Sequence, residues 1–372
     1  MLNTFEDRAE SGGFVHLFES ARRWRDFDLT VFGPQAARQR VADKLPGADF
    51  VPIPSCEGVT RNRLVVHAFR MIAAAVMLPG RLRRFDAIYV LSHSLADLAP
   101  AVLASPRRTV AQVFHLQPLP WKRPGSIVNN TFAYANEVLG IGTVRLFVRN
   151  VVVLTTLMEP QLRLPSRTRV FVVGSGTWTI PVDGVRRDSA ARSGAVYVGR
   201  LHPAKGVDDL IAAWAIVHSQ VPDAVLTLVG GGDPDFVDSL KARVGALGLG
   251  PSVRFAGFVS DLEKANAISS SRVFVSASIE EGWGIAVGEA LSLGVPCVTY
   301  DLPVYRAVFP GGRIAAPLRD VSAFAAGIVT LLRDDDRNRL LSAQAGELSK
   351  DFSWDSVARI EEDAIRAASK TV

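Results

Sequence analysis

Two patterns of apolar and polar residues alternate along the chain. Short apolar runs bounded by glycine, proline or charged residues predict buried strands, and stretches with apolar residues at every third or fourth position predict helices. In the first half, strands are expected at 28–32, 50–52, 87–91, 109–114 and 150–154. In the second half, strands are expected near residues 196, 224, 253 and 272. Strands that alternate with helices in this way indicate parallel sheets and an α/β fold.

Length and composition indicate two domains. The chain has 372 residues, 48% hydrophobic and 21% charged, which is enough apolar material for two separate cores. The first strand is expected to be a stub at 1–5, followed by a charged turn at 6–13 and a helix near 14–24. Cys56 and Cys297 are far apart and lack metal-ligand spacing, which favours a reduced, cytoplasmic setting.

A turn broken by glycines, between a strand and a helix, is the strongest candidate for chemistry. The apolar run at 272–276 leads to Gly282 and Gly284, and a helix is expected to begin at Ile285 and Ala286. The N-terminus of a helix presents free N–H groups and the positive end of the helix dipole. Both features suit an anionic diphosphate.

Two glutamates flank this turn. Glu281 precedes the expected helix and Glu289 lies inside it. Carboxylates at these positions can each accept two hydrogen bonds from a vicinal diol, which sugars and ribose both offer. The residues alone are equally consistent with an acidic turn that complements the helix dipole, with Glu289 on a solvated face.

A second loop adds two cations. Arg200 and Lys205 follow the apolar run at 196–198, beyond the carboxyl end of a predicted strand, where open α/β sheets bind ligands. Two cations on one loop match the charge of one diphosphate. Without the flanking Gly199 and Gly206, a solvated pair would be the simpler interpretation.

Residue types and spacing over about twenty positions resemble a known family. Ser278 is followed by Glu281, a glycine, an aromatic residue and Gly284, a second glutamate stands eight positions after the first, and Gly294-Val295-Pro296 comes next. The chain therefore resembles the retaining glycosyltransferases of family 4, which have the GT-B fold. The resemblance implies two Rossmann-like domains with parallel sheets that face each other across a cleft. The implied parts are an acceptor-side domain at 1–165, a donor domain at 166–350, and a helix at 351–372 that packs back across the domain boundary.

The resemblance also implies a role for each candidate side chain. Arg200 and Lys205 would hold the donor pyrophosphate and neutralise charge on the leaving nucleoside diphosphate. Glu281 would orient the sugar hydroxyls, and Glu289 would hold the ribose diol.

Other positions are implied at the edges of the donor cleft. Val259 and Asp261 match the loop that contacts the base, although Asp261 is also placed to cap a helix beginning near residue 262. Gly12 and Gly13 would allow close approach to a phosphate or sugar, or simply form a turn. His115, at the end of a strand, would line the cleft near the reacting carbon, or bond a loop carbonyl.

The predicted activity is transfer of a hexosyl group from a nucleoside diphosphate sugar to an acceptor hydroxyl, with retention of configuration. No cofactor or metal is expected, because Arg and Lys supply the positive charge. Asp233 and Asp235 resemble a metal-binding pair but are interpreted as helix capping. A sugar-nucleotide epimerase of the same fold and a non-catalytic sugar-nucleotide-binding protein are the alternatives. The sequence leaves the sugar, base, acceptor and oligomeric state open.

Charge is unevenly distributed along the chain. Residues 1–165 carry 20 Lys and Arg against 13 Asp and Glu, and residues 166–372 carry 22 against 24. The basic residues are not interleaved with aromatics, so nucleic acid is not an expected partner.

The basic half contains an apolar segment at 61–84 that predicts a helix with Arg63, His67, Arg70 and Arg81 on one side, although Pro79 should end it before Arg81. Such a helix is either ordinary core or an interfacial element. The second alternative suggests an anionic membrane surface, a lipid-linked or cell-envelope glycan acceptor, and a cytoplasmic enzyme that is peripheral on the inner face of the plasma membrane.

Overall fold

The computed structural model describes residues 12–53, 63–114, 116, 120–122, 127–178, 185, 192–348, 350 and 352–370. The chain divides into two compact units. Unit 1 comprises Met1–Gly176 and Trp354–Val372, and unit 2 comprises Thr177–Ser353. The observed boundaries lie slightly later in the chain than the expected 165 and 350.

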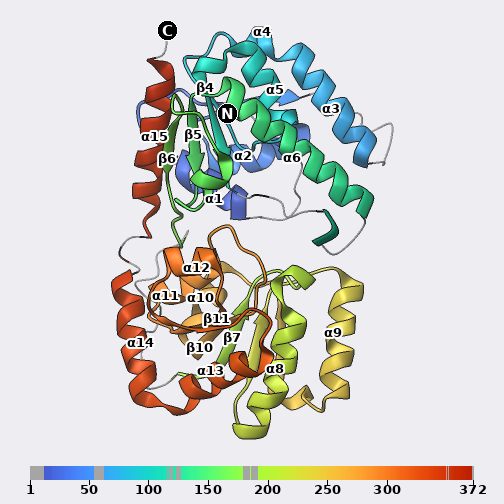
Figure 1. Ribbon diagram of the computed structural model, residues 1–372, viewed down its shortest axis with the longest axis vertical. Coiled ribbons are helices and arrows are strands. Elements are labelled where there is room, and N and C mark those ends of the chain that lie inside the picture. The colour runs from blue at the N-terminus through green and yellow to red at the C-terminus, as the bar shows by residue number, and fades with distance from the viewer. Residues whose placement is uncertain are drawn as a thin grey trace. The chain divides into compact units, whose positions relative to one another are not determined.

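Unit 1 contains parallel strands covered by helices (Figure 1). β1 pairs with β2, and the other four strands form a sheet in the order β3-β4-β5-β6. The strands are β1 (Thr30–Pro34), β2 (Asp49–Ile53), β3 (Ile88–Val90), β4 (Thr109–Val113), β5 (Asn150–Val153) and β6 (Arg169–Val172). The helices are α1 (Gly12–Ala21), α2 (Arg38–Lys44), α3 (Arg63–Met77), α4 (Pro79–Leu82), α5 (Leu95–Ala104), α6 (Ile127–Phe147), α7 (Met158–Leu162) and α15 (Trp354–Ser369). The five strands predicted within this unit are confirmed, with small shifts at their ends.

The first helix differs from the expectation. α1 begins at Gly12, so Gly12 and Gly13 form its first turn and do not end the preceding turn. The first N–H groups of a helix need no intrahelical partner, which makes this end tolerant of glycine. Residues 1–11, including the expected strand stub, lie outside the described residues.

The last helix, α15, belongs to unit 1 although it follows unit 2 in the chain, and it packs against α1 and the sheet. Its Glu361 is 1% exposed and accepts hydrogen bonds from the Tyr89 hydroxyl at 2.6 Å and from the Ser20 hydroxyl. The ring Nε2 of His16 lies 3.0 Å from the same carboxylate. Burial, followed by the charge of Glu361, raises the pKa of Tyr89 well above its ordinary value. This buried polar network joins α15 to α1 and β3.

Unit 2 is a six-stranded parallel sheet in the order β12-β11-β10-β7-β8-β9 (Figure 1). The strands are β7 (Ser193–Val198), β8 (Leu226–Val229), β9 (Val253–Gly257), β10 (Ser271–Ser276), β11 (Cys297–Tyr300) and β12 (Arg313–Ala316). The helices are α8 (Val207–Gln220), α9 (Pro234–Ala246), α10 (Asp261–Ser269), α11 (Ile285–Ser292), α12 (Pro303–Val308), α13 (Val321–Arg333) and α14 (Asp335–Leu348). Strands and helices alternate as the apolar pattern predicts.

The core of unit 2 lies between the sheet and α8, α9 and α13. Trp214 of α8 is fully buried among side chains of these helices and of the strands β7, β8 and β10. The central strands β10 and β11 are buried along nearly their whole length, which explains why they appear in the sequence as nearly continuous apolar runs. Cys297, the first residue of β11, is fully buried and reduced, as expected for a core residue.

Candidate active site

The strand order of unit 2 reverses between β7 and β10. From β7 the chain builds outward through β8 and β9, and it then returns to pair β10 with the other edge of β7. Open parallel sheets bind ligands beyond the carboxyl ends of the strands at such a switch point. The loop after β7 carries Arg200 and Lys205, and the loop after β10 carries Glu281. The predicted cations and the predicted glutamate therefore lie on loops that follow two adjacent strands.

The two loops contact each other through their backbones. The N–H of Ile279 donates to the carbonyl of Ala204 at 3.2 Å. Gly206 has a φ of 63°, and a Cβ atom there would lie 1.9 Å from the carbonyl oxygen of Ala277. Any other residue at this position would be strained and would push the loops apart.

Lys205 and Glu281 form an ion pair between these loops. The Nζ atom of Lys205 lies 2.7 Å from Oε1 of Glu281, and the two side chains are 26% and 17% exposed. The hydroxyl of buried Tyr197 donates to the carbonyl of Arg200 at 2.9 Å. Burial, followed by the charge of Glu281, raises the pKa of this tyrosine, while the exposed Arg200 acts in the opposite direction. The loop after β7 thus offers one exposed and one partly buried cation.

The N-terminus of α11 carries no side-chain cap. Its N-cap is Gly284, with φ 99° and ψ 55°, a residue that has no side chain to accept a hydrogen bond from the first turn. A Cβ atom at Gly284 would lie 2.5 Å from the ring of Tyr305, so the close approach of this ring also requires glycine. The N–H groups at Ile285 and Ala286 stand at the positive end of the helix dipole. Gly282 lies in the bend that precedes this helix.

Glu289 is on the fifth position of α11 and is buried, which contradicts the alternative that placed it on a solvated face. Its Oε1 atom lies 2.8 Å from Nζ of Lys264, on α10. The same ammonium lies 3.1 Å from Oδ1 of Asp261. Burial raises the pKa of Glu289, and Lys264 opposes that shift. The two glutamates of the motif therefore contact different lysines from different elements.

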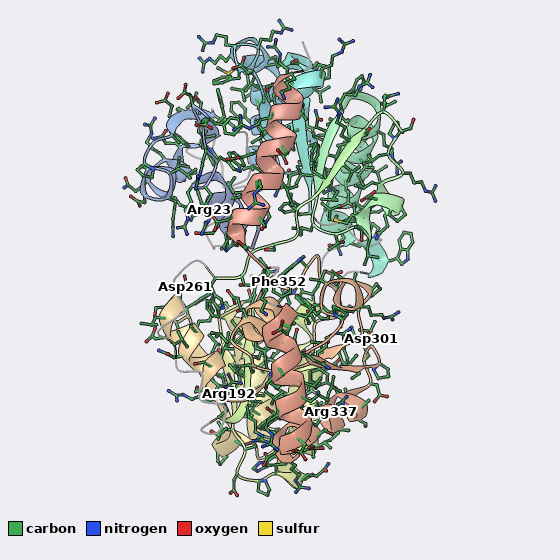
Figure 2. The ribbon with its side chains drawn as sticks, turned by 90° about the vertical axis from the view of Figure 1, so that its left-hand side faces the viewer. Arg23, Arg192, Asp261, Asp301, Arg337 and Phe352 are labelled. Carbon is green, nitrogen blue, oxygen red and sulfur yellow. The ribbon has the colours of Figure 1, made fainter. Side chains whose placement is uncertain are left out.

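The loop between β9 and α10 holds the predicted base contacts. Ser260, not Asp261, is the N-cap of α10, and it forms a capping box with Glu263. Asp261 is the first residue of the helix (Figure 2). Its side chain is 48% exposed. Val259 is partly buried, and the ring of the preceding Phe258 is 86% exposed. Because Ser260 supplies the cap, the carboxylate of Asp261 is not needed for that role.

Comparisons with known proteins indicate the kind of enzyme. The group described as glycosyl transferases group 1 matches residues 192–347. A phosphatidyl-myo-inositol mannosyltransferase from Mycolicibacterium smegmatis is 24% identical over 92% of this chain and 86% of its own length. Another from Mycobacterium leprae is 32% identical, over 56% of this chain and 59% of its own. The chain is a glycosyltransferase.

Solved structures agree on the fold of this glycosyltransferase. Sucrose-phosphate synthase from Thermosynechococcus elongatus superposes with a TM-score of 0.77 at 18% identity, covering 96% of this chain and 93% of its own. Anabaena HepE in complex with UDP and glucose gives a TM-score of 0.74 at 18% identity, covering 98% of both chains. These structural neighbours are GT-B glycosyltransferases, and the GT-B prediction is confirmed.

The remaining predicted residues of the glycosyltransferase lie in unit 1 or outside the description. Gly12 and Gly13 form the first turn of α1, and His115 lies outside the described residues. Asp233 caps α9, since its Oδ1 atom accepts from the N–H of Asp235 at 3.1 Å. The capping interpretation is therefore confirmed for Asp233. The described part of the chain holds no group of three or more His, Cys, Asp or Glu side chains placed to bind a metal ion.

Sequence reasoning missed Lys264 and Trp178. Lys264 stands three positions after Asp261, a spacing that puts both on one helix face, and this was the available signal. Trp178 gave no such signal, because its contacts come from distant residues. Its indole N–H donates to the Ser292 hydroxyl at 2.6 Å, and its ring lies 4.9 Å from the Lys264 ammonium.

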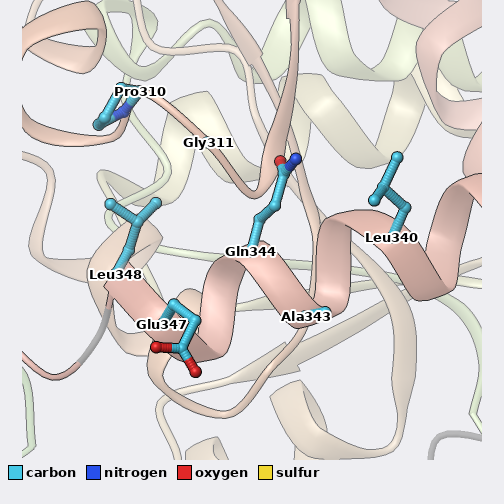
Figure 3. Close-up of a pocket in the computed structure, with 7 residues that line it drawn as sticks. All are labelled: Pro310, Gly311, Leu340, Ala343, Gln344, Glu347 and Leu348. Carbon is cyan, nitrogen blue, oxygen red and sulfur yellow. The ribbon is translucent and has the colours of Figure 1, made fainter.

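An open apolar hollow elsewhere on unit 2 contains none of these residues (Figure 3). It lies between the loop at Pro310 and Gly311 and the helix α14. The rest of its lining is Leu340, Ala343, Gln344, Glu347 and Leu348. With a single carboxylate and no cation in this lining, the hollow lacks the chemistry for a diphosphate.

Proposed function

We propose that the enzyme is a retaining glycosyltransferase that moves a hexosyl group from a nucleoside diphosphate sugar to an acceptor hydroxyl. The observation that carries this proposal is the Lys205–Glu281 pair between the loops that follow β7 and β10. A cation for the diphosphate and a carboxylate for the sugar hydroxyls meet at one switch point. The uncapped N-terminus of α11 lies on the same loop as Glu281.

In the proposed mechanism, no side chain attacks the sugar. The acceptor oxygen forms a bond to the anomeric carbon on the face from which the diphosphate departs, and a phosphate oxygen takes the acceptor proton. Arg200, Lys205 and the N–H groups of α11 stabilise the charge that develops on the leaving diphosphate. Glu281 orients sugar hydroxyls, and Glu289 accepts hydrogen bonds from the ribose diol. Attack on the face from which the diphosphate departs retains the anomeric configuration. The assignment of this mode of attack rests on the resemblance to family 4.

For the donor we propose a guanine nucleotide that carries mannose. The relatives named above act on phosphatidyl-myo-inositol as mannosyltransferases, and an O-antigen chain mannosyltransferase from Escherichia coli is 28% identical over 44% of this chain. The Asp261 carboxylate suits the two neighbouring N–H donors on the edge of guanine, whereas uracil offers a single N–H.

For the acceptor we propose a lipid-linked or phospholipid hydroxyl at an anionic membrane surface. Helix α3 exposes the apolar side chains of Phe69, Ile72, Val76 and Met77, so its apolar face is not simply buried core. It ends at Met77, before Arg81, as Pro79 predicts. Residues 63–149 contain 11 Lys and Arg against 3 Asp and Glu, and two of those three acids, Asp97 and Glu137, are buried. Exposed apolar groups beside excess positive charge fit the interface of an anionic bilayer.

No described helix is long and apolar enough to pass through a bilayer. The proposed attachment is peripheral, and it requires both the apolar and the basic groups. Arg63, His67 and Arg70 lie on α3, although their side chains are outside the description.

The donor assignment is tested by thermal shift with GDP, UDP, ADP and dTDP, followed by transfer assays with the matching sugar nucleotides. A ligand at about a hundred times its Kd stabilises a protein by roughly 2.7 kcal/mol, which is enough to rank the bases. We expect GDP to stabilise most and GDP-mannose to be hydrolysed slowly without acceptor. Binding without transfer or hydrolysis would favour the non-catalytic alternative, and a product with an inverted sugar centre would favour the epimerase.

A further inference from the structure

Glu289, the proposed ribose ligand, belongs to a compact charged cluster with Lys264, Asp261 and Trp178. The ammonium of Lys264 lies 2.8 Å from Glu289 and 3.1 Å from Asp261. Its third neighbour is the face of the Trp178 ring, at 4.9 Å. A cation over an indole ring is attracted by its quadrupole. The lysine is therefore surrounded by two carboxylates and an aromatic face.

The indole ring is itself fixed in place. Its N–H donates to the Ser292 hydroxyl at 2.6 Å, and that hydroxyl donates to the carbonyl of Glu289 at 2.7 Å. Trp178 and Glu289 are thus held by the same end of α11. The cluster sets the position of the Lys264 ammonium relative to the carboxylate that it contacts.

A buried carboxylate needs a nearby cation to stay ionised, since removal from water favours its neutral form. Glu289 is 5% exposed, and its role in the proposed mechanism requires an ionised group. An ionised carboxylate only accepts hydrogen bonds and can receive two from a diol, whereas a protonated one donates one and fits a diol less well.

We propose that Lys264 is a positioning residue, which holds the Glu289 carboxylate ionised and oriented for the ribose diol, with Trp178 fixing the ammonium. The proposal rests on the proposed donor site and adds to it a second residue that tunes nucleotide binding. Lys264 acts through Glu289, so its removal should change how binding depends on pH.

The direction of that change follows from the groups that face Glu289. Lys264 lowers the pKa of Glu289, whereas burial and the neighbouring charge of Asp261 raise it, and the net direction is upward. Binding should be complete above that pKa and should weaken as the pH falls through it. Without the ammonium, the pKa rises further and the loss of binding begins at a higher pH.

The test is the Kd of GDP, with UDP in parallel, measured by titration calorimetry between pH 5.5 and 8.5. Lys264→Met removes the charge at similar length, Lys264→Arg keeps it, and Trp178→Phe removes the indole N–H. The matched control is Lys241→Met, since Lys241 pairs with Asp238 on the exposed face of α9. We expect the acid limb, meaning the loss of GDP binding as the pH falls, to begin about one pH unit or more higher in Lys264→Met than in the wild type. The reason is that an opposite charge typically shifts a carboxyl pKa by one to three units. Lys264→Arg should restore the limb, Trp178→Phe should move it slightly upward, and the control should leave it unchanged.

The outcomes separate this proposal from the donor assignment. If Lys264→Met weakens binding by the same factor at every pH, the lysine contacts the nucleotide or supports the fold, and the positioning role is overturned. Glu289→Gln should bind weakly with no acid limb of its own. If Glu289→Gln binds like the wild type, or no nucleoside diphosphate binds the wild type, the proposed donor site fails instead.

Discussion

Replacement of Lys205 by alanine tests the leaving-group role most directly. The change removes an ammonium that lies 2.7 Å from Glu281 and keeps the backbone of the loop after β7. Loss of one preorganised charge that acts on a developing anion typically lowers turnover by about 100-fold to 1000-fold, or roughly 2.7 to 4 kcal/mol. Stability should change much less, because a partly exposed ion pair contributes on the order of 0.2 to 1 kcal/mol.

These two magnitudes give separate readouts. A loss of up to about 1 kcal/mol should lower the Tm of a unit of this size by only about 2 to 4 °C. Turnover is measured with saturating GDP-mannose, the proposed donor, by release of GDP with and without acceptor, and Lys241→Ala serves as the control. If Lys205→Ala turned over within threefold of the control, the leaving-group role would be wrong. A fall in activity matched by a large fall in Tm would mean that Lys205 is structural.

Four further outcomes follow from the same geometry. Transfer should survive EDTA, because Arg200, Lys205 and α11 provide the positive charge; activity lost with EDTA and restored by magnesium or manganese would contradict this. Gly206→Ala should destabilise unit 2 by about 1 to 2 kcal/mol from backbone strain alone and weaken donor binding, whereas Gly245→Ala, in open space on α9, should not. The enzyme should sediment with anionic vesicles at low salt and be released by salt. Replacing Val76 of α3 by Glu should abolish that sedimentation, and equal recovery with neutral vesicles would leave α3 as an ordinary surface helix.

The strands and the loops of the proposed donor site could be predicted from the sequence because their determinants are local. A buried parallel strand appears as a short apolar run, and β7 and β10 were found in this way. The glycines at 206 and 284 mark positions where a side chain would collide with neighbouring backbone or ring atoms. Such steric constraints require glycine, so these positions can be recognised in the sequence.

The environment of Glu289 could not be predicted, because it depends on contacts between distant segments. The sequence alone left a solvated face as an equal alternative, and the structure buries the carboxylate against α10. Likewise, the hydroxyl of Ser260 takes the cap position that seemed open to Asp261. In both cases more than one local arrangement was compatible with the sequence, and tertiary packing determined which one the chain adopts.

Glu281 and Glu289 pair with different lysines, which suggests different roles for the two glutamates in the proposed donor site. Glu281 forms an ion pair with Lys205. The proposed mechanism needs this ammonium for the diphosphate, so donor binding would have to break or loosen the ion pair. Glu289 forms an ion pair with Lys264, and the same ammonium also contacts the Asp261 carboxylate and the Trp178 ring. A diol can bind the second carboxylate while its cation stays in place, because the ammonium contacts Oε1 and a carboxylate offers about four lone-pair positions. Substitutions at Lys205 should therefore act mainly on turnover, and substitutions at Lys264 mainly on nucleotide affinity and its pH dependence.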